Sequence, residues 1–229
     1  MTIPIVAVAV VAVAIVLVVI VASTSRRVDP IVRRYTTYAS HRGWSRIPAD
    51  HTKERLEPFG EYLDGGASIR VAIAGPLGSG RGMAAVIEQR EGGRPWYVAV
   101  ADSEALLDAT PVQMDPRAVR TVRVMDVREV QVDEPRIARG WRVTSPEHDA
   151  AEAWLHTGRR AVELSDVLHR PHPWVFGIRV RPGSIAVHLV RREEHVADVD
   201  DLARLVTLVG DLASALDVTP VGGRGPAAN

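Results

Sequence analysis

The chain has 229 residues, and its 28 Lys or Arg are balanced by 28 Asp or Glu, so its formal net charge at pH 7 is zero. A neutral chain lacks the overall positive field that is typical of nucleic-acid-binding proteins, and we expect no nucleic-acid partner. The sequence contains no Cys, which excludes disulfide bonds, thiolate metal sites and lipid attachment through a thiol.

An apolar run without charged or hydrogen-bonding side chains occupies residues 3–22. As a helix it would be about 30 Å long, which matches the hydrocarbon thickness of a bilayer. A single segment in lipid has to satisfy its backbone hydrogen bonds internally, and a helix does so. The sequence therefore predicts an N-terminal transmembrane helix, with residues 1–22 as the anchor and the lipid bilayer as its partner.

The charges after this run predict the orientation of the anchor. Residues 26–55 hold eight Lys or Arg against three acidic residues. The positive-inside rule then places the amino terminus outside the cell membrane and the rest of the chain in the cytoplasm. The alternative is a signal peptide that is cleaved near residue 22, which would export the domain to the cell envelope. A missing basic segment before the run, and the length of the run, disfavour this alternative.

A short amphipathic helix follows the anchor, within a basic juxtamembrane segment that we assign to residues 23–60. Asp29 and Pro30 are typical of a helix start, and Gly43 is typical of a helix end. Its apolar residues recur on one face, which either lies on the membrane or packs on the soluble domain. The candidates for contact with anionic lipid headgroups are Arg26, Arg27, Arg33, Arg34 and Arg42.

Residues 61–217 form the predicted soluble domain. Alternating apolar residues predict strands that begin at Ser68, at Met83 and near Arg94, and two others over 119–127 and 129–133. Another strand is expected at 141–143. A helix that begins at Ser145 and another over 160–169 follow, and then a hairpin over 174–191. An apolar stripe predicts a final amphipathic helix over 200–216, and the tail 218–229, which has no periodicity, is predicted to be disordered. Antiparallel hairpins with helices on one face predict an α+β domain.

One glycine-rich segment, Gly75–Gly82, has the glycine spacing of a phosphate-binding loop. Arg81 stands where that loop needs Lys, and Gly82 stands where it needs Ser or Thr. The residues that follow continue as a strand, so the segment favours a hairpin turn. A nucleotide-binding or enzymatic domain built on this loop stays open as an alternative.

The rest of the sequence contains no recognisable catalytic or metal-binding motif. The eight His residues lack the spacing of zinc ligands, and there is no G-x-S-x-G motif around a nucleophilic Ser. We therefore assign no catalytic residue, no cofactor and no metal ligand, and the sequence favours a non-catalytic protein over an enzyme.

Several loose motifs lie in the same order as in a known group of proteins. They are Arg26-Arg27 after the anchor, residues 38–44, Gly80-Arg81, residues 141–146, the hairpin and the last helix. With them the chain resembles uncharacterised single-pass membrane proteins of actinobacteria, a family of unknown function, over most of residues 3–217. The resemblance implies organisation and source but no chemistry. We predict a membrane-anchored cytoplasmic module that binds a protein partner or the membrane surface.

Overall fold

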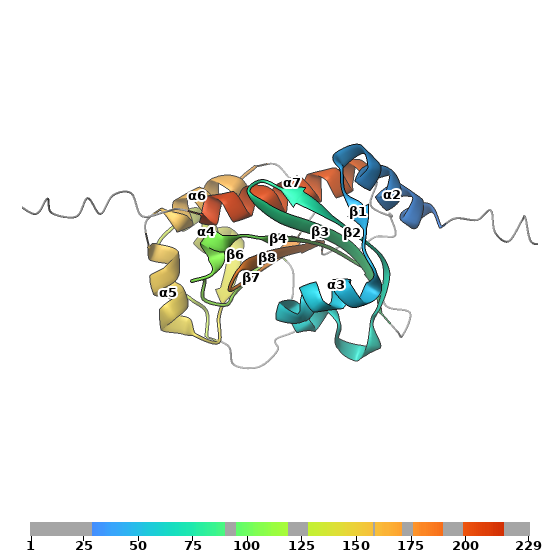
Figure 1. The fold of residues 1–229 in the computed structure, drawn as a ribbon. Helices are drawn as coiled ribbons and strands as arrows, with labels where there is room; N and C mark the ends of the chain where they lie inside the picture. Colours follow the sequence, from blue (N-terminus) through green and yellow to red (C-terminus); the bar gives the residue numbers. More distant parts are fainter. Residues whose placement is uncertain are drawn as a thin grey trace, which may run out of the picture.

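A computed structural model describes the chain over residues 29–89, 95–118, 128–157, 159–170, 176–189 and 199–217. Within these ranges, eight antiparallel strands form one sheet in the order β1-β2-β3-β4-β8-β7-β5-β6 (Figure 1). The strands are β1 (Ser45–Arg46), β2 (Ser68–Leu77), β3 (Gly80–Glu88), β4 (Trp96–Asp102), β5 (Val112–Pro116), β6 (Trp141–Thr144), β7 (Phe176–Arg181) and β8 (Ser184–Leu189). The helices are α2 (Pro30–Arg42), α3 (Ala49–Leu56), α4 (Pro135–Gly140), α5 (His148–His156), α6 (Arg160–Leu168) and α7 (Val199–Leu216). The chain is therefore an α+β protein, as predicted.

The topology places the last hairpin in the middle of the sheet. β8 pairs with β4 and β7 pairs with β5, so the β7–β8 hairpin joins the two halves of the sheet. A tight turn closes this hairpin, and Gly183 there has a φ of 77°, in the left-handed region that glycine adopts without strain. Residues that are distant in sequence therefore meet on the central strands.

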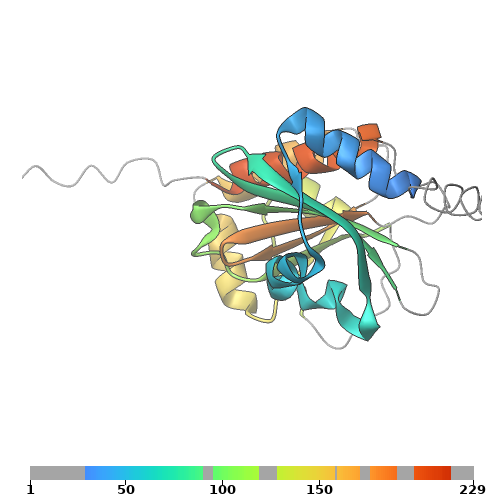
Figure 2. The ribbon, with the colours of Figure 1, turned by 45° about the vertical axis from the view of Figure 1, so that its right-hand side comes forward.

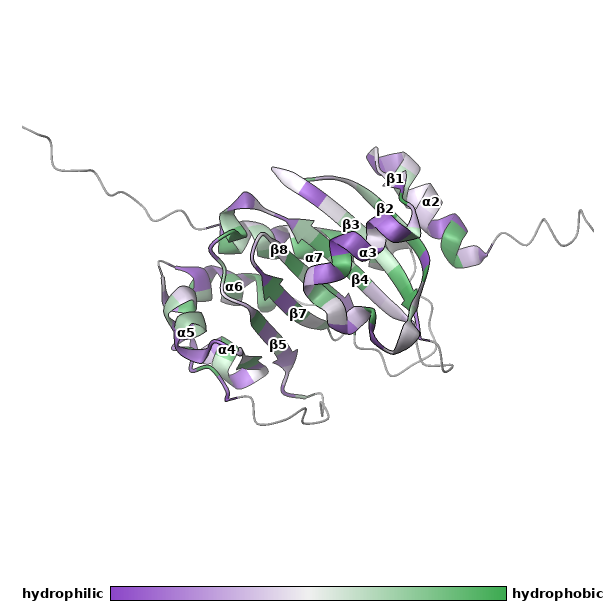
Figure 3. Ribbon diagram, turned by 60° about the horizontal axis from the view of Figure 1, so that its bottom comes forward, coloured by the Kyte–Doolittle hydropathy of each residue, from purple (hydrophilic) through white to green (hydrophobic). Residues whose placement is uncertain are grey.

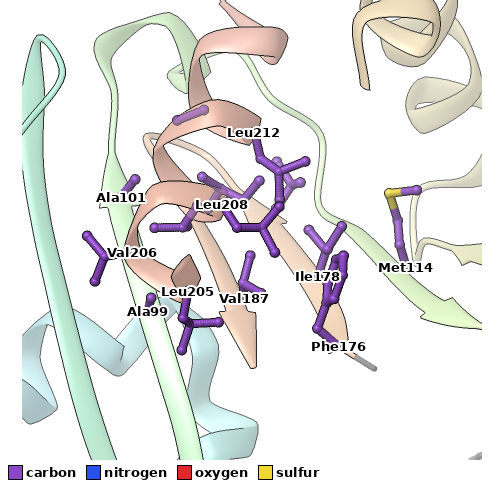
Figure 4. Packing of buried hydrophobic residues seen from close by; sticks show 14 of the residues in the cluster. Ala99, Ala101, Met114, Phe176, Ile178, Val187, Leu205, Val206, Leu208 and Leu212 are labelled. Atoms are coloured by element: carbon purple, nitrogen blue, oxygen red, sulfur yellow. The ribbon is translucent and has the colours of Figure 1, made fainter. Parts of the chain in front are cut away.

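One face of the sheet is covered by α7 and α2, which lie side by side above the strands (Figures 1 and 2). Figure 4 shows Leu205, Val206 and Leu208 of α7 pointing toward the alanines and valines of β4 and β8. Gly210 in the middle of α7 has a packing reason, because a Cβ there would lie 3.2 Å from Leu77 Cδ1. The predicted apolar stripe of the last helix thus contributes to the main core.

The opposite face is covered over β2, β3 and β4 by α3 and by the 3-10 segment Glu57–Tyr62. A second buried cluster forms there from Leu56, Phe59 and Tyr62 against small side chains such as Ala72 and Ala85. The prediction of helices on one face only was wrong. The reason is that the chain passes around the β2 edge through β1, with α2 on one side of the sheet and α3 on the other.

Several predicted elements are confirmed, and others are corrected. The strands from Ser68 to Asp102, the β7–β8 hairpin and the helices α2, α6 and α7 lie where the periodicity placed them. The predicted strand 129–133 is reduced to an isolated bridge between Glu129 and Thr144. The helix expected from Ser145 begins at His148 instead, and the Ser145 hydroxyl accepts a hydrogen bond from Glu147 N and donates one to Pro111 O.

Three predictions fall on residues outside the described ranges: the anchor 3–22, the strand 119–127 and the tail 218–229. Among the helices that the structure does describe, none has the length and apolar character to cross a bilayer.

Candidate functional site

The predicted membrane-surface arginines occupy different parts of the chain. Arg26 and Arg27 lie outside the described residues, whereas the other three are on α2. Arg33 is exposed and Arg34 is half-buried, both in the first half of the helix. Arg42 is exposed in the last turn, about 13 Å farther along the helix axis, with its guanidinium 5.9 Å from the centre of the Tyr38 ring. The structure therefore does not place Arg42 beside Arg33 and Arg34.

The apolar face of α2 packs on the domain. Ile31, Tyr35, Tyr38 and Ala39 are all buried, and α2 contacts β1, β2 and α7. Burial of this face against the sheet removes it from contact with lipid. Of the two alternatives for this face, the structure shows packing on the domain, so membrane contact by α2 is left to its charged side chains.

The first turn of α2 is held to the sheet by ionic contacts. The Asp29 carboxylate accepts hydrogen bonds from Ile31 N, at 2.9 Å, and from Arg70 Nε on β2. Arg70 also donates to Glu88 Oε1 on β3 at 2.8 Å. The hydrogen bond from Arg70 lowers the pKa of Asp29, and the same bond raises the pKa of Arg70. We call Asp29, Arg70 and Glu88 the α2 clasp.

A β-bulge gives Arg70 its direction. The pairing of β2 with β3 shifts between Ile69 and Val71, so Arg70 is the extra residue. Because a bulge interrupts the alternation of side chains, Arg70 and the next residue, Val71, both lie on the α2 side: Arg70 reaches the clasp, and Val71 packs in the main core.

A polar cluster lies on the second face, beyond the part that α3 covers. Its centre is His188 on β8, which is 5 % exposed. Nδ1 of His188 shares a hydrogen bond of 2.8 Å with the hydroxyl of Tyr62, and the ring stacks on Trp96 with 5.1 Å between ring centres. Gly177 provides the space for the ring, because a Cβ there would lie 2.7 Å from His188 Nε2. Burial, and secondly the charge of Arg179, lower the pKa of His188 to about 3, so this imidazole is neutral at physiological pH.

Charged side chains surround this histidine in compensated pairs. Arg179 on β7 is buried, donates to Asp115 Oδ1 at 3.0 Å and lies 3.3 Å from a Glu61 carboxylate oxygen. Arg181 lies 3.7 Å from the same carboxylate and donates to Pro58 O at 3.0 Å. These contacts connect the 3-10 segment to β5 and β7. Because each guanidinium already has carboxylate or carbonyl partners, the cluster is a structural connection rather than a site for an anion.

Sequence analysis did not single out this cluster, although a signal for it was present. Along β7 and β8 the apolar residues alternate with Gly177, Arg179 and Arg181 and with Ser184, Ala186 and His188. Such alternation indicates that one face of the hairpin is polar. Figure 3 shows hydrophilic colouring on β7 and β5, in the part of the face that α3 does not cover. The described residues contain no group of three or more His, Asp or Glu side chains placed to bind a metal ion.

The Gly75–Gly82 segment is a β-hairpin. Gly75 pairs with Gly82 and Leu77 with Gly80, so the segment belongs to the sheet ladder rather than to a loop that precedes a helix. Its glycines instead accommodate Trp44: a Cβ at Gly75 would lie 2.7 Å from Trp44 Nε1, and one at Gly82 would lie 2.8 Å from Trp44 Cη2. Trp44 Nε1 donates to Pro76 O at 3.0 Å. The glycine spacing thus has a packing explanation.

A groove of about 380 Å³ runs along the edge of β2, between residues 46–49 and residues 69–72. β1 pairs with only two residues of β2, and Ile47 N donates to Ala72 O at 3.1 Å. Within this short pairing Arg46 is exposed, and beside it lie Pro48 and the bulge at Arg70. A short strand, a charged side chain, a proline and a bulge are features by which edge strands resist pairing with another chain. The groove is therefore a protected sheet edge.

Comparisons of the chain with protein-family models, with curated proteins and with solved structures found no match. The resemblance to actinobacterial single-pass membrane proteins stays a prediction.

Proposed function

We propose that this protein is a membrane-anchored module that binds a protein partner on the cytoplasmic side and catalyses no reaction. Residues 3–22 would be the anchor, with the amino terminus outside. The observation that supports this most directly is the attachment of α2 to the sheet. α2 begins eight positions after the predicted anchor, its apolar face is buried, and its first turn is fixed by the α2 clasp. The domain would therefore be held rigidly beside the bilayer.

Two further observations support a binding role over the alternatives. The polar cluster around His188 consists of side chains that bind one another, with compensated charges. The glycine-rich segment is a hairpin shaped around Trp44. Since the apolar face of α2 is buried in the domain, a protein partner accounts for the module better than insertion into the membrane surface.

A reporter fusion tests the anchor and its orientation. Two reporters are fused in turn to Asn229 of the full chain, one active only in the cytoplasm and one active only outside. We expect signal from the cytoplasmic reporter alone, because basic residues follow the anchor. Signal from the external reporter alone would overturn the proposed location and favour a function in the cell envelope.

Affinity capture tests the binding role. The full chain, tagged after Asn229, is purified from native membranes and compared with residues 1–28 fused to an unrelated soluble domain. A protein that is enriched with the full chain and absent from the control is the expected result. Equal recovery from both would contradict the proposal, because the described domain would then contribute no binding.

A further inference from the structure

The connection between the predicted anchor and the domain is short compared with the domain itself. Seven residues, 23–29, separate the end of the anchor from Pro30. Fully extended they span at most about 25 Å. A folded domain of this length is about 40 Å across. The distance from Pro30 to the bilayer therefore always stays below one domain diameter. The side of the domain that lies opposite Pro30 cannot face the membrane.

The attachment point is at one end of the sheet. α2 starts beside Arg70, and Trp44, two residues after the end of the helix, donates to Pro76 O, so the helix follows β2 from near its first residue to near its last. Figures 1 and 2 show the first turn of α2 at the periphery of the molecule. Ser68, Glu88 and Trp96 pair with neighbouring residues at this same end, whereas the β2–β3 turn lies at the other end.

The charges near the attachment point suit an anionic surface. Arg33 is exposed, Arg34 is half-buried in the same part of α2, and Arg26 and Arg27 precede them in the sequence. Two acidic groups at this end, Asp29 and Glu88, are bound to Arg70 within the clasp and so repel phosphate less, whereas Asp64, four residues before Ser68, is exposed. An Arg near an anionic membrane surface contributes favourably to binding.

We infer that the end of the sheet at which β2 begins and β3 ends is the surface that faces the lipid headgroups, with the β2–β3 turn directed away from the bilayer. The inference rests on the proposed anchor and adds the orientation of the domain to it.

The experiment compares two single-cysteine labels on one hairpin. Ser68 and Ser79 are both exposed, at opposite ends of β2, and the native chain offers no other thiol. The full chain with Ser68→Cys or Ser79→Cys is labelled with a fluorophore. It is then incorporated into vesicles of phosphatidylcholine and phosphatidylglycerol that contain a headgroup-attached quencher. Because the labels lie roughly 30 Å apart along the strand, we expect quenching at residue 68 to be at least about twofold greater.

A longer connection gives the matched control. An insertion of about twenty Gly and Ser residues after Ser25 adds an average reach of roughly 25 Å, so the difference between the two labels should shrink. Equal quenching at both positions of the native-length chain, or stronger quenching at residue 79, would overturn the orientation. A chain that does not float with the vesicles would instead overturn the anchor itself, so the two failures are distinguishable.

Discussion

At the scale of single residues, two buried tyrosines show what one hydrogen bond contributes. The Tyr35 hydroxyl is buried and has no hydrogen-bond partner among the described residues, whereas the Tyr62 hydroxyl binds His188. Burial raises the pKa of both phenols far above the ordinary value. Both side chains therefore stay protonated, and only one of the two hydroxyls is compensated for its loss of water.

We expect opposite effects from removing the two hydroxyls. Tyr35→Phe should raise the free energy of unfolding by about 1 kcal/mol, because it removes an uncompensated polar group. Tyr62→Phe should lower it by about 1 kcal/mol or more, because it leaves His188 Nδ1 without its partner. Urea unfolding of the two variants and of the unaltered chain measures both values. A loss of stability in Tyr35→Phe would show that its hydroxyl has a partner.

His188 should make the stability of the domain depend on pH. The pKa of His188 is lowered to about 3 in the folded chain, from an ordinary value of 6.5. Between these values the unfolded chain binds a proton that the folded chain does not, so stability falls as the pH drops below about 6.5. The contribution is at most about 1.4 kcal/mol per pH unit.

The control for this pH dependence is His188→Gln, which cannot titrate. Unfolding of both chains by urea is measured at several values between about pH 7.5 and pH 5.5, above the range in which most carboxylates titrate. The native chain should lose stability more steeply than the variant as the pH falls. Parallel curves would contradict the buried neutral state of His188.

At the scale of elements, Trp44 and the β2–β3 hairpin depend on each other. The indole ring occupies the space above Gly75 and Gly82, where side chains would otherwise stand. Gly82→Ala should lower the free energy of unfolding by about 1–3 kcal/mol, because the new methyl group would overlap Trp44 and Leu77.

Gly140→Ala is the matched control for this change. A Cβ at Gly140 meets no atom within 4 Å, and its φ is not positive. Since Ala loses less backbone entropy on folding than Gly, this variant should gain up to about 1 kcal/mol. Thermal unfolding of both variants distinguishes the packing effect from a general effect of Gly→Ala substitution. Equal shifts of Tm would show that Trp44 can move aside.

How far the sequence predicted these elements follows from how each one is buried. The β7–β8 hairpin and α7 have one apolar face each, and β2 alternates large apolar residues on one face with alanines on the other, so periodicity marked all three. α3 was missed because Thr52 and Leu56 are its only buried residues, too few to form a stripe. β5 was missed because it has five residues and ends at Pro116. Asp115 of β5 binds Arg179, which is 64 positions away along the chain. The polar cluster therefore depends on a pairing that no local sequence pattern contains.

At the scale of the whole molecule, residues 29–60 are part of the folded body. The sequence assigned residues 23–60 to a juxtamembrane segment and placed the soluble domain at 61–217. In the structure, however, α2 and α3 cover opposite faces of the sheet. Their segment supplies large buried side chains to both clusters: Ile31, Tyr35, Tyr38, Trp44, Leu56 and Phe59. The two faces therefore depend on residues that precede the predicted boundary.

We expect residues 29–217 to fold without the preceding residues and residues 61–217 not to fold. The shorter chain loses six large buried side chains, each worth about 1.5–3 kcal/mol, whereas domains are typically stable by only about 5–15 kcal/mol. Near-ultraviolet circular dichroism and urea unfolding of the two chains measure the difference. The longer chain should unfold in one cooperative transition, and the shorter chain should show none. A cooperative transition in 61–217 would instead make α2 and α3 a separable arm between the anchor and the sheet, and the orientation inferred from the α2 clasp would lose its rigid connection.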